Sequence, residues 1–285
     1  MTKVIDRYVD STNKIVVLCD CTPPRSGDPE ALDRVAVVEA DYICVAYNPG
    51  KLPRANSVIA AHIIRERTGR DVVFNIATRD MNKLAIQSQL LGAQMVNLQN
   101  VIALQGDGFT DAETEQVKTV GDFTSTGFIA ALSAMNKGLD YRGSKMRGNT
   151  DFCIGATLDL ERDLVREVKL AQRKIKAGAH YFITQPTYDL NLRQRFLDEY
   201  EIQIGITFPA PVFWGLQILD KDGIVLGNVP QLRRQLDSGR PGIEIASELL
   251  QSYVAAGVRG VYLVPPILRG GARDYDVAQQ VLESV

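Results

Sequence analysis

The sequence predicts a single (β/α)8 TIM barrel that spans residues 1–285. Short runs rich in β-branched residues alternate with longer stretches of helical hydrophobic spacing, and no change in composition divides the chain. A length of 285 residues is usual for one such barrel. A doubly wound α/β fold is the second possibility, but no G-x-G-x-x-G motif follows the first predicted strand.

Eight apolar runs qualify as strands: Ile15–Asp20, Tyr42–Ala46, Val72–Ile76, Val101–Leu104, Phe152–Ala156, Tyr181–Thr184, Val212–Leu216 and Val261–Val264. Helical patterns follow them at Glu30–Val38, Ser57–Thr68, Asn82–Met95, Thr124–Lys137, Leu160–Ala177, Leu190–Tyr200 and Ile243–Ala256, and from Tyr275 onward. Gly178 and Gly257 each stand just before a predicted strand and indicate helix ends.

Composition and charge are those of a soluble globular protein. Apolar residues make up 45% of the chain and charged residues 23%. The formal net charge of −2 does not indicate the positively charged surface that binds nucleic acid or a membrane. The first residues lack the apolar core of a signal peptide, and no run is long enough for a membrane span. The four cysteines (Cys19, Cys21, Cys44 and Cys153) fall in strand-like runs and are expected to be buried thiols. We therefore expect a cytoplasmic protein.

Polar residues follow most of the predicted strands, where a barrel places its active site. They are Asp20, Tyr47, Asn48, Asn75 to Asp80, Gln105, Asp107, Thr157, Asp159, Gln185 and Gln217. The set holds carboxylates and amides but no histidine, so we expect neither a metal site nor a Ser-His-Asp arrangement. Asp107 and Gln185 could present acceptor and donor groups to a pterin or flavin ring. Long segments at 108–122 and 219–242 lie on the same side and are expected to carry function.

Four motifs follow one another in a fixed order along the chain: Arg79-Asp80-Met81-Asn82, Leu104-Gln105-Gly106-Asp107, Ile183-Thr184-Gln185-Pro186 and Tyr262-Leu263-Val264-Pro265-Pro266. Together they resemble the methylenetetrahydrofolate reductase family, most closely the reductase half of bifunctional homocysteine methyltransferase/reductase chains. The resemblance implies a flavoprotein of one-carbon metabolism and methionine biosynthesis. Such an enzyme uses NADH or NADPH, through FAD, to reduce methylenetetrahydrofolate to methyltetrahydrofolate.

The resemblance also implies roles for individual residues. Asp20 takes the place of the family's general-acid glutamate, while Asp107 and Gln185 take the places of residues beside flavin and folate. The implied cofactor-binding residues are Tyr47, Asn75, Gln105, Gly106, Asp107, Thr157, Glu167, Arg173 and Lys174. A proton from Asp20 would open the five-membered ring of the folate to an iminium, which then accepts hydride from reduced flavin.

Several pocket positions depart from the family pattern. Asp20 is one methylene shorter than the usual glutamate, and Asn75 stands in place of a histidine. Gln105 replaces an arginine, Thr157 replaces an aromatic residue, and the segment 218–229 is unlike its counterpart.

These departures keep a second hypothesis open. It is a flavin-free barrel that binds a folate or pterin and acts as a one-carbon carrier or as a subunit beside an electron-transfer or methyltransferase partner. A lyase or aldolase on the same fold is a third hypothesis, although no strand end supplies the lysine that an aldolase needs. Association of the barrel with copies of itself through its outer helices also stays open.

Overall fold

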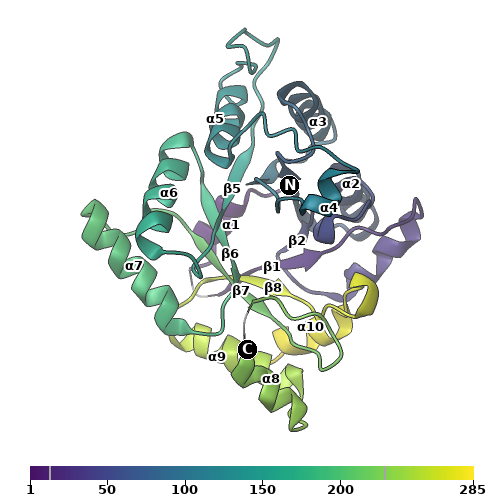
Figure 1. Ribbon diagram of the computed structural model, residues 1–285, viewed down its shortest axis with the longest axis vertical. Coiled ribbons are helices and arrows are strands. Elements are labelled where there is room, and N and C mark those ends of the chain that lie inside the picture. The colour runs from purple at the N-terminus through teal and green to yellow at the C-terminus, as the bar shows by residue number, and fades with distance from the viewer. Residues whose placement is uncertain (13, 228) are drawn as a thin grey trace.

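The computed structural model describes residues 1–12, 14–227 and 229–285. Its strands close into a parallel barrel in chain order, and β8 pairs with β1 (Figure 1). The strands are β1 (Val16–Cys21), β2 (Tyr42–Val45), β3 (Asp71–Ala77), β4 (Asn100–Leu104), β5 (Cys153–Leu158), β6 (Tyr181–Pro186), β7 (Val212–Gln217) and β8 (Gly260–Val264). The predicted (β/α)8 barrel is confirmed, and each predicted strand ends within two residues of the observed one.

Helices surround the strands at the predicted places (Figure 1). They are α2 (Ser57–Thr68), α3 (Lys83–Met95), α5 (Ser125–Met135), α6 (Leu164–Ala177), α7 (Leu190–Ile204), α9 (Gly242–Ala255) and α10 (Tyr275–Leu282). Gly178 ends α6 in the left-handed conformation, as its position predicts. None of the helices in the described ranges combines the length and apolarity that a membrane span requires.

The α-helix predicted at Glu30–Val38 is wrong, because this segment is the 3-10 helix η1 (Pro29–Val37). Its buried residues explain the difference. Leu32, Val35 and Val38 recur every third residue, which suits the three residues per turn of a 3-10 helix.

Several short elements were not predicted. α4 (Asp111–Thr114) and α8 (Pro230–Asp237) lie inside the two long segments, and η2 (Pro49–Lys51) and η3 (Arg269–Gly271) follow β2 and β8. The first helix, α1 (Val4–Asp10), packs Val4, Ile5 and Tyr8 against the side chains inside the barrel.

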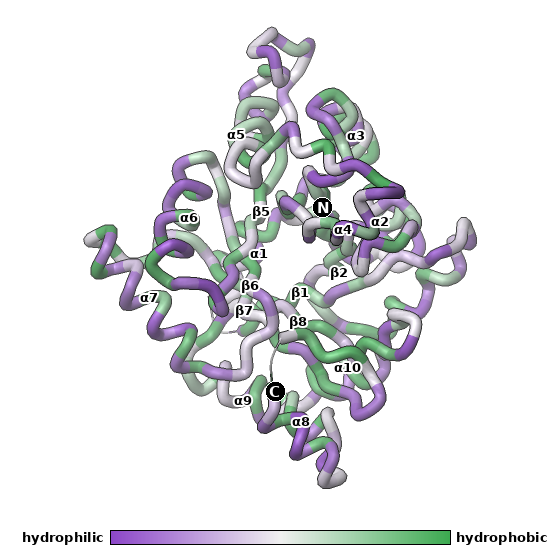
Figure 2. The backbone as a smooth tube through the Cα atoms, in the orientation of Figure 1, coloured by the Kyte–Doolittle hydropathy of each residue, from purple (hydrophilic) through white to green (hydrophobic). Residues whose placement is uncertain are grey.

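The barrel separates two hydrophobic cores. The inner core lies among the strands and includes Leu18, Cys44 and Phe213, whereas the outer core lies between strands and helices. Cys19 and Cys21 belong to the outer core, so they point away from Asp20, as strand alternation predicts. All four cysteines are buried free thiols, as expected. Figure 2 shows hydrophilic and hydrophobic residues alternating along outer helices such as α7.

Polar contacts fix α1 to the barrel at both of its ends. The Asn100 side chain accepts a hydrogen bond from the Val4 backbone N–H (3.1 Å) and donates one to the Thr2 carbonyl (3.0 Å). The Arg259 guanidinium lies over the Tyr8 ring, 4.5 Å from its centroid, and donates to the Tyr8 and Ser11 carbonyls. The N-terminal segment is therefore an integral part of the barrel.

We predict that Arg259→Met lowers the free energy of unfolding by about 1–3 kcal/mol, because two half-buried carbonyls lose their donor. Urea denaturation measures the loss, and limited proteolysis should cut the segment before β1 more readily. Arg166→Met is the control, since Arg166 is exposed and its contact with Asp163 is loose at 3.7 Å. Equal stability of the two variants would contradict the prediction.

Candidate functional site

Two cavities open where the strands end at their C-terminal edge. We call the first the polar cavity; it has a volume of about 600 Å³, and its wall includes Arg79, Gln105, Gly106, Ser125, Asp159, Arg162, Glu167 and Lys174. We call the second the arginine cavity; it has a volume of about 550 Å³, and its wall includes Asp20, Arg25, Leu52, Arg54, Asn75, Ile224, Leu226, Tyr262, Ile267 and Arg273. Six residues line both and form the shared wall: Tyr47, Pro49, Leu104, Asp107, Thr157 and Gln185.

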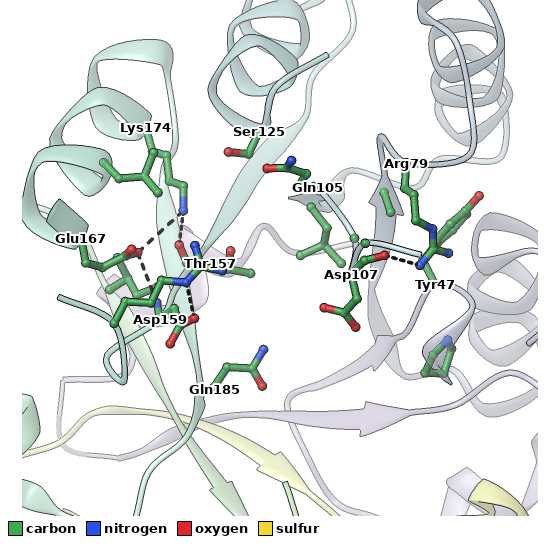
Figure 3. A pocket seen from close by; sticks show the side chains of 18 of the residues that line it. Tyr47, Arg79, Gln105, Asp107, Ser125, Thr157, Asp159, Glu167, Lys174 and Gln185 are labelled. Atoms are coloured by element: carbon green, nitrogen blue, oxygen red, sulfur yellow. Dashed lines mark hydrogen bonds and ion pairs between the residues drawn. The ribbon is translucent and has the colours of Figure 1, made fainter. Parts of the chain in front are cut away.

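The shared wall brings together four of the predicted site residues: Tyr47, Asp107, Thr157 and Gln185. Asp107 follows β4, Thr157 lies near the end of β5 and Gln185 lies in β6, so three successive strands supply these three residues. Asp107 and Gln185 are exposed, and Figure 3 shows their side chains reaching into the same space. A ligand there would meet a carboxylate on one side and an amide on the other.

Arg79 holds the turn that carries Asp107. It is buried, pairs with Asp80 (2.6 Å) and donates to the Asp107 carbonyl (3.1 Å). Its guanidinium also lies 4.7 Å from the centroid of the Phe109 ring. Gly106 has a φ of +83°, and a Cβ there would lie 3.2 Å from the Cβ atoms of Ala77 and Arg79. The turn thus needs glycine, both for its backbone angle and for space.

Glu167 and Lys174 form a buried ion pair on α6, with Nζ 4.0 Å from a carboxylate oxygen. Lys174 donates a hydrogen bond to the Thr157 carbonyl (2.5 Å), and Glu167 accepts one from the Asp159 backbone N–H (3.2 Å; Figure 3). Burial raises the pKa of Glu167 and lowers that of Lys174, and each charge partly opposes the effect on the other. Arg173 instead lies on the exposed face of α6, and the structure does not bring it into either cavity.

The remaining predicted cofactor-binding residues lie at the rim or the base of the site. Gln105 is exposed in the polar cavity, while Asn75 is buried in the base of the arginine cavity. The Asn75 side chain accepts a hydrogen bond from the Cys44 thiol (3.6 Å). Burial, followed by the nearby Asp80 carboxylate, raises the pKa of Tyr47 to about 12.

Asp20, the predicted acid, is fully engaged at the base of the arginine cavity. The Tyr262 hydroxyl donates to its Oδ1 (2.7 Å), and Arg273 donates from Nε (2.9 Å) and pairs through Nη2 (2.8 Å) at Oδ2. All three groups line the cavity, and Asp20 and Arg273 are both buried. Both oxygens of the Asp20 carboxylate therefore accept hydrogen bonds from the cavity wall.

Sequence reasoning did not identify Arg273, Arg25 or Arg54 as site residues. Arg273 lies nine residues beyond the end of β8, and Arg54 lies nine residues beyond β2, so neither directly follows a strand. One signal was available. In a closed barrel the loop after β8 must lie beside the end of β1, where Asp20 is placed.

The long segment after β7 forms part of the cavity wall. Gln217 donates to the Ile224 carbonyl (2.7 Å) and accepts from the Leu226 N–H (2.8 Å), and Ile224 N–H donates to the Ile267 carbonyl (2.7 Å). These bonds place Ile224 and Leu226 at the arginine cavity. Asn228, in the same segment, lies outside the described residues.

Neither histidine lies in these cavities. His180 accepts a hydrogen bond from the Ile154 N–H at Nδ1 (2.9 Å), and burial lowers its pKa, which suits a neutral packing residue. Within residues 1–12, 14–227 and 229–285, no cluster of His, Cys, Asp and Glu has the form of a metal site.

We predict that Gly106→Ala destabilises the Asp107 turn by about 1–3 kcal/mol, because a left-handed angle and close Cβ contacts both oppose the methyl group. Gly108→Ala is a matched control two residues away, since a Cβ at Gly108 meets nothing within 4 Å. Thermal unfolding compares the two variants. Similar melting temperatures would show that the turn tolerates a side chain at 106.

We predict that Glu167→Gln destabilises the protein by about 3–5 kcal/mol at neutral pH, because it leaves Lys174 as a buried cation without a partner. The double variant Glu167→Gln/Lys174→Met should be more stable than this single variant, since it removes both charges. Denaturant titrations of the wild-type protein, the two single variants and the double variant measure the coupling. An additive loss in the double variant would contradict a coupled pair.

Comparison with known proteins gives a family and a fold. The family model for methylenetetrahydrofolate reductase matches residues 5–216. No curated protein sequence matches the chain. Among solved structures, an uncharacterized protein from Clostridium thermocellum that binds two copies of 5-methyl-5,6,7,8-tetrahydrofolic acid is similar at a TM-score of 0.65 and 10% identity, over 99% of this chain and 97% of that chain. At this identity the likeness shows the fold.

A putative lyase/mutase from Burkholderia cenocepacia J2315 is also similar, with a TM-score of 0.48 and 13% identity over 98% of this chain and 93% of that chain. The family match is the finding that bears on identity, because it covers well over half of the 285 residues and includes β1 through most of β7. The motifs around Asp107 and Gln185 fall inside it. The chain therefore belongs to the methylenetetrahydrofolate reductase family.

Proposed function

We propose that the protein reduces 5,10-methylenetetrahydrofolate to 5-methyltetrahydrofolate with FAD and NADH or NADPH. FAD would occupy the polar cavity and the folate would occupy the arginine cavity. The shared wall is the observation that carries this proposal. Hydride transfer needs donor and acceptor atoms in contact, and two ligands on either side of Asp107, Thr157 and Gln185 would meet.

The residues of the polar cavity suit FAD. Lys174 is a desolvated ammonium with a single hydrogen bond, so it retains donors for a phosphate or ribose oxygen. Ser125 begins α5 at the cavity wall, where backbone N–H groups favour an anion. Gly106 allows close approach of a flat ring. The bound flavin would supply the two-electron chemistry that the side chains lack.

The residues of the arginine cavity would bind and orient the folate. Asp107 accepts hydrogen bonds, and the Gln185 amide both donates and accepts them, which matches the mixed edge of a pterin ring. Leu52, Ile224 and Leu226 add an apolar wall for an aromatic ring. The cavity therefore offers polar contacts at one side and apolar contacts along its length.

Asp20 is the proposed proton source for opening the folate ring. Its carboxylate lies at the base of the arginine cavity, where Arg273 holds Oδ2. The Tyr262 hydroxyl orients the carboxylate through Oδ1. The contacts with Arg273 and Tyr262 thus fix the position of the carboxylate from which the proton would come.

We predict that Arg273→Gln slows the reduction of methylenetetrahydrofolate by roughly 10²-fold, because Asp20 loses the guanidinium contacts that position its carboxylate. The rate of flavin reoxidation by methylenetetrahydrofolate tests this. Asp20→Asn should slow the same step by roughly 10²–10⁴-fold and leave flavin reduction by NADH unchanged. An unchanged rate of flavin reoxidation in Asp20→Asn would remove Asp20 from the role of acid.

The visible spectrum of the purified protein, before and after addition of FAD, tests the proposal as a whole. We expect a flavin band near ~450 nm that bleaches with NADH or NADPH and returns with methylenetetrahydrofolate. A protein that takes up no FAD would contradict it.

The flavin-free folate-binding barrel is the second candidate, and one observation favours it. Each cation that lines the polar cavity pairs with a carboxylate: Arg79 with Asp80, Arg162 with Asp159, and Lys174 with Glu167. Among the described residues of the cavity wall, no cation is left unpaired to bind the diphosphate of FAD. Tight binding of methyltetrahydrofolate by a protein that takes up no FAD would identify this candidate, a one-carbon carrier or complex subunit.

A further inference from the structure

Helix α3 turns an apolar stripe toward solvent. Leu84, Leu91 and Met95 are 62%, 44% and 85% exposed, and Ser88 is exposed between them. Steps of four, three and four residues place these four side chains on one side of the helix, which is the spacing of a coiled-coil seam. The buried side of α3, which includes Leu90, lies opposite and packs on the barrel. The stripe is therefore a second apolar surface that the barrel itself does not cover.

The surface around this stripe lacks charge. No Asp, Glu, Lys or Arg occurs between Leu84 and Gly106, whereas the outer helices α6 and α7 each carry several. An outer helix that faces only water has charged and polar residues on its outer side. The centre of a protein interface is instead depleted of charge and enriched in methionine. The exposed side of α3 thus has the composition of an interface.

A glycine in the middle of α3 points the same way. Gly92 lies in the helix interior and is exposed, and a Cβ there would meet nothing within 4 Å. Packing within the chain therefore does not require glycine, although glycine weakens a helix relative to alanine. Its absence of a side chain lets the backbone of a neighbouring helix approach closely.

An acidic segment lies at the beginning of α3. Asp122 accepts a hydrogen bond from the Lys83 backbone N–H in the first turn of the helix (3.3 Å), and the Lys83 ammonium lies 5.2 Å from the centroid of the Phe123 ring. We call residues 111–122 the acidic segment, because they hold four carboxylates against one lysine. Glu115, in this segment, is exposed.

A basic hairpin lies at the other end of α3. It follows α5, and an antiparallel bridge joins Leu139 to Lys145 within it. Where the chain returns, the Asp151 N–H donates to the Gln94 side chain in the last turn of α3 (3.0 Å). Figure 1 shows this segment projecting outward beyond α5, next to α3. We call residues 137–147 the basic hairpin, because Asp140 is its one carboxylate against four cations: Lys137, Arg142, Lys145 and Arg147.

We infer that two copies of the chain associate through α3, with the two helices antiparallel about a two-fold axis. The beginning of each α3 then lies beside the end of the other, so the basic hairpin of each copy meets the acidic segment of its partner. Within the seam, Leu91 of each copy faces Ser88 of the other, so a large side chain meets a small one at the centre. Antiparallel helix dipoles also attract each other.

The size of the contact fits this arrangement. A helix of thirteen residues is ~20 Å long, so α3 supplies the apolar centre of the interface. A stable interface covers about 800 Å² on each partner, which requires a rim beyond one helix. The hairpin and the acidic segment supply that rim, and the exposed Val117 and Val120 extend its apolar part. No residue of α3 lines either cavity, so each copy keeps its own site.

Sedimentation velocity of the full chain at micromolar concentration tests the interface. We expect a species of twice the 31.4 kDa mass of one chain. Leu91→Glu and Met95→Glu should each raise the dimer dissociation constant by about 100-fold or more, because association would bury a carboxylate without a partner. Ile202→Glu is the matched control, since Ile202 is an equally apolar, 78% exposed residue on α7, and this variant should stay a dimer.

A charge reversal tests the orientation of the two helices. Arg142→Glu should weaken the dimer by about tenfold, and adding Glu115→Arg should restore it, because the two positions lie on facing segments. A wild-type protein that sediments as a monomer would overturn the inference, and so would a dimer that Leu91→Glu and Met95→Glu leave intact. Met95 is so exposed that its variant keeps the fold even if Leu91→Glu does not. A second reversal that fails to restore affinity would overturn the antiparallel arrangement.

Discussion

The ion pair between Asp20 and Arg273 connects the first strand of the barrel to the loop that follows the last one. Both groups are buried, so the pair persists only because Tyr262 and the two guanidinium contacts satisfy both carboxylate oxygens. The loop that carries Arg273 pairs through Ile267 with Ile224, and Gln217 fixes Ile224 in turn. One charge pair thereby organises the loops after β7 and β8 and the wall of the arginine cavity.

Much of the fold follows from the period of the hydrophobic residues. The alternation in β1 places Cys19 and Cys21 on the helix side and Asp20 inside the barrel, which the sequence alone indicates. The error at η1 has the same origin, because Leu32, Val35 and Val38 recur with a period of three. Helix α1 was not predicted, for a different reason. Its seven residues give too short a pattern, and its stability comes from contacts with Asn100 and Arg259 far along the chain.

The site was predictable where a functional residue lies at the end of a strand or directly after it. Asp107, Thr157 and Gln185 meet because the C-terminal ends of neighbouring parallel strands share one edge. Arg54 and Arg273 lie beyond loops whose paths the sequence does not specify. Arg173 shows the limit of residue-by-residue transfer, since adjacent positions on α6 point to different sides and only Lys174 faces the cavity.

The contacts of α1 also constrain the order of folding events. The ribosome releases this segment before the rest of the barrel, and its partners Asn100 and Arg259 emerge 96 and 248–251 residues later. The helix is too short to persist alone, so it must wait for the other end of the barrel to form before it docks. Docking of α1 is therefore a late step, and protection of its backbone amides from hydrogen exchange reports that the sheet has closed between β8 and β1.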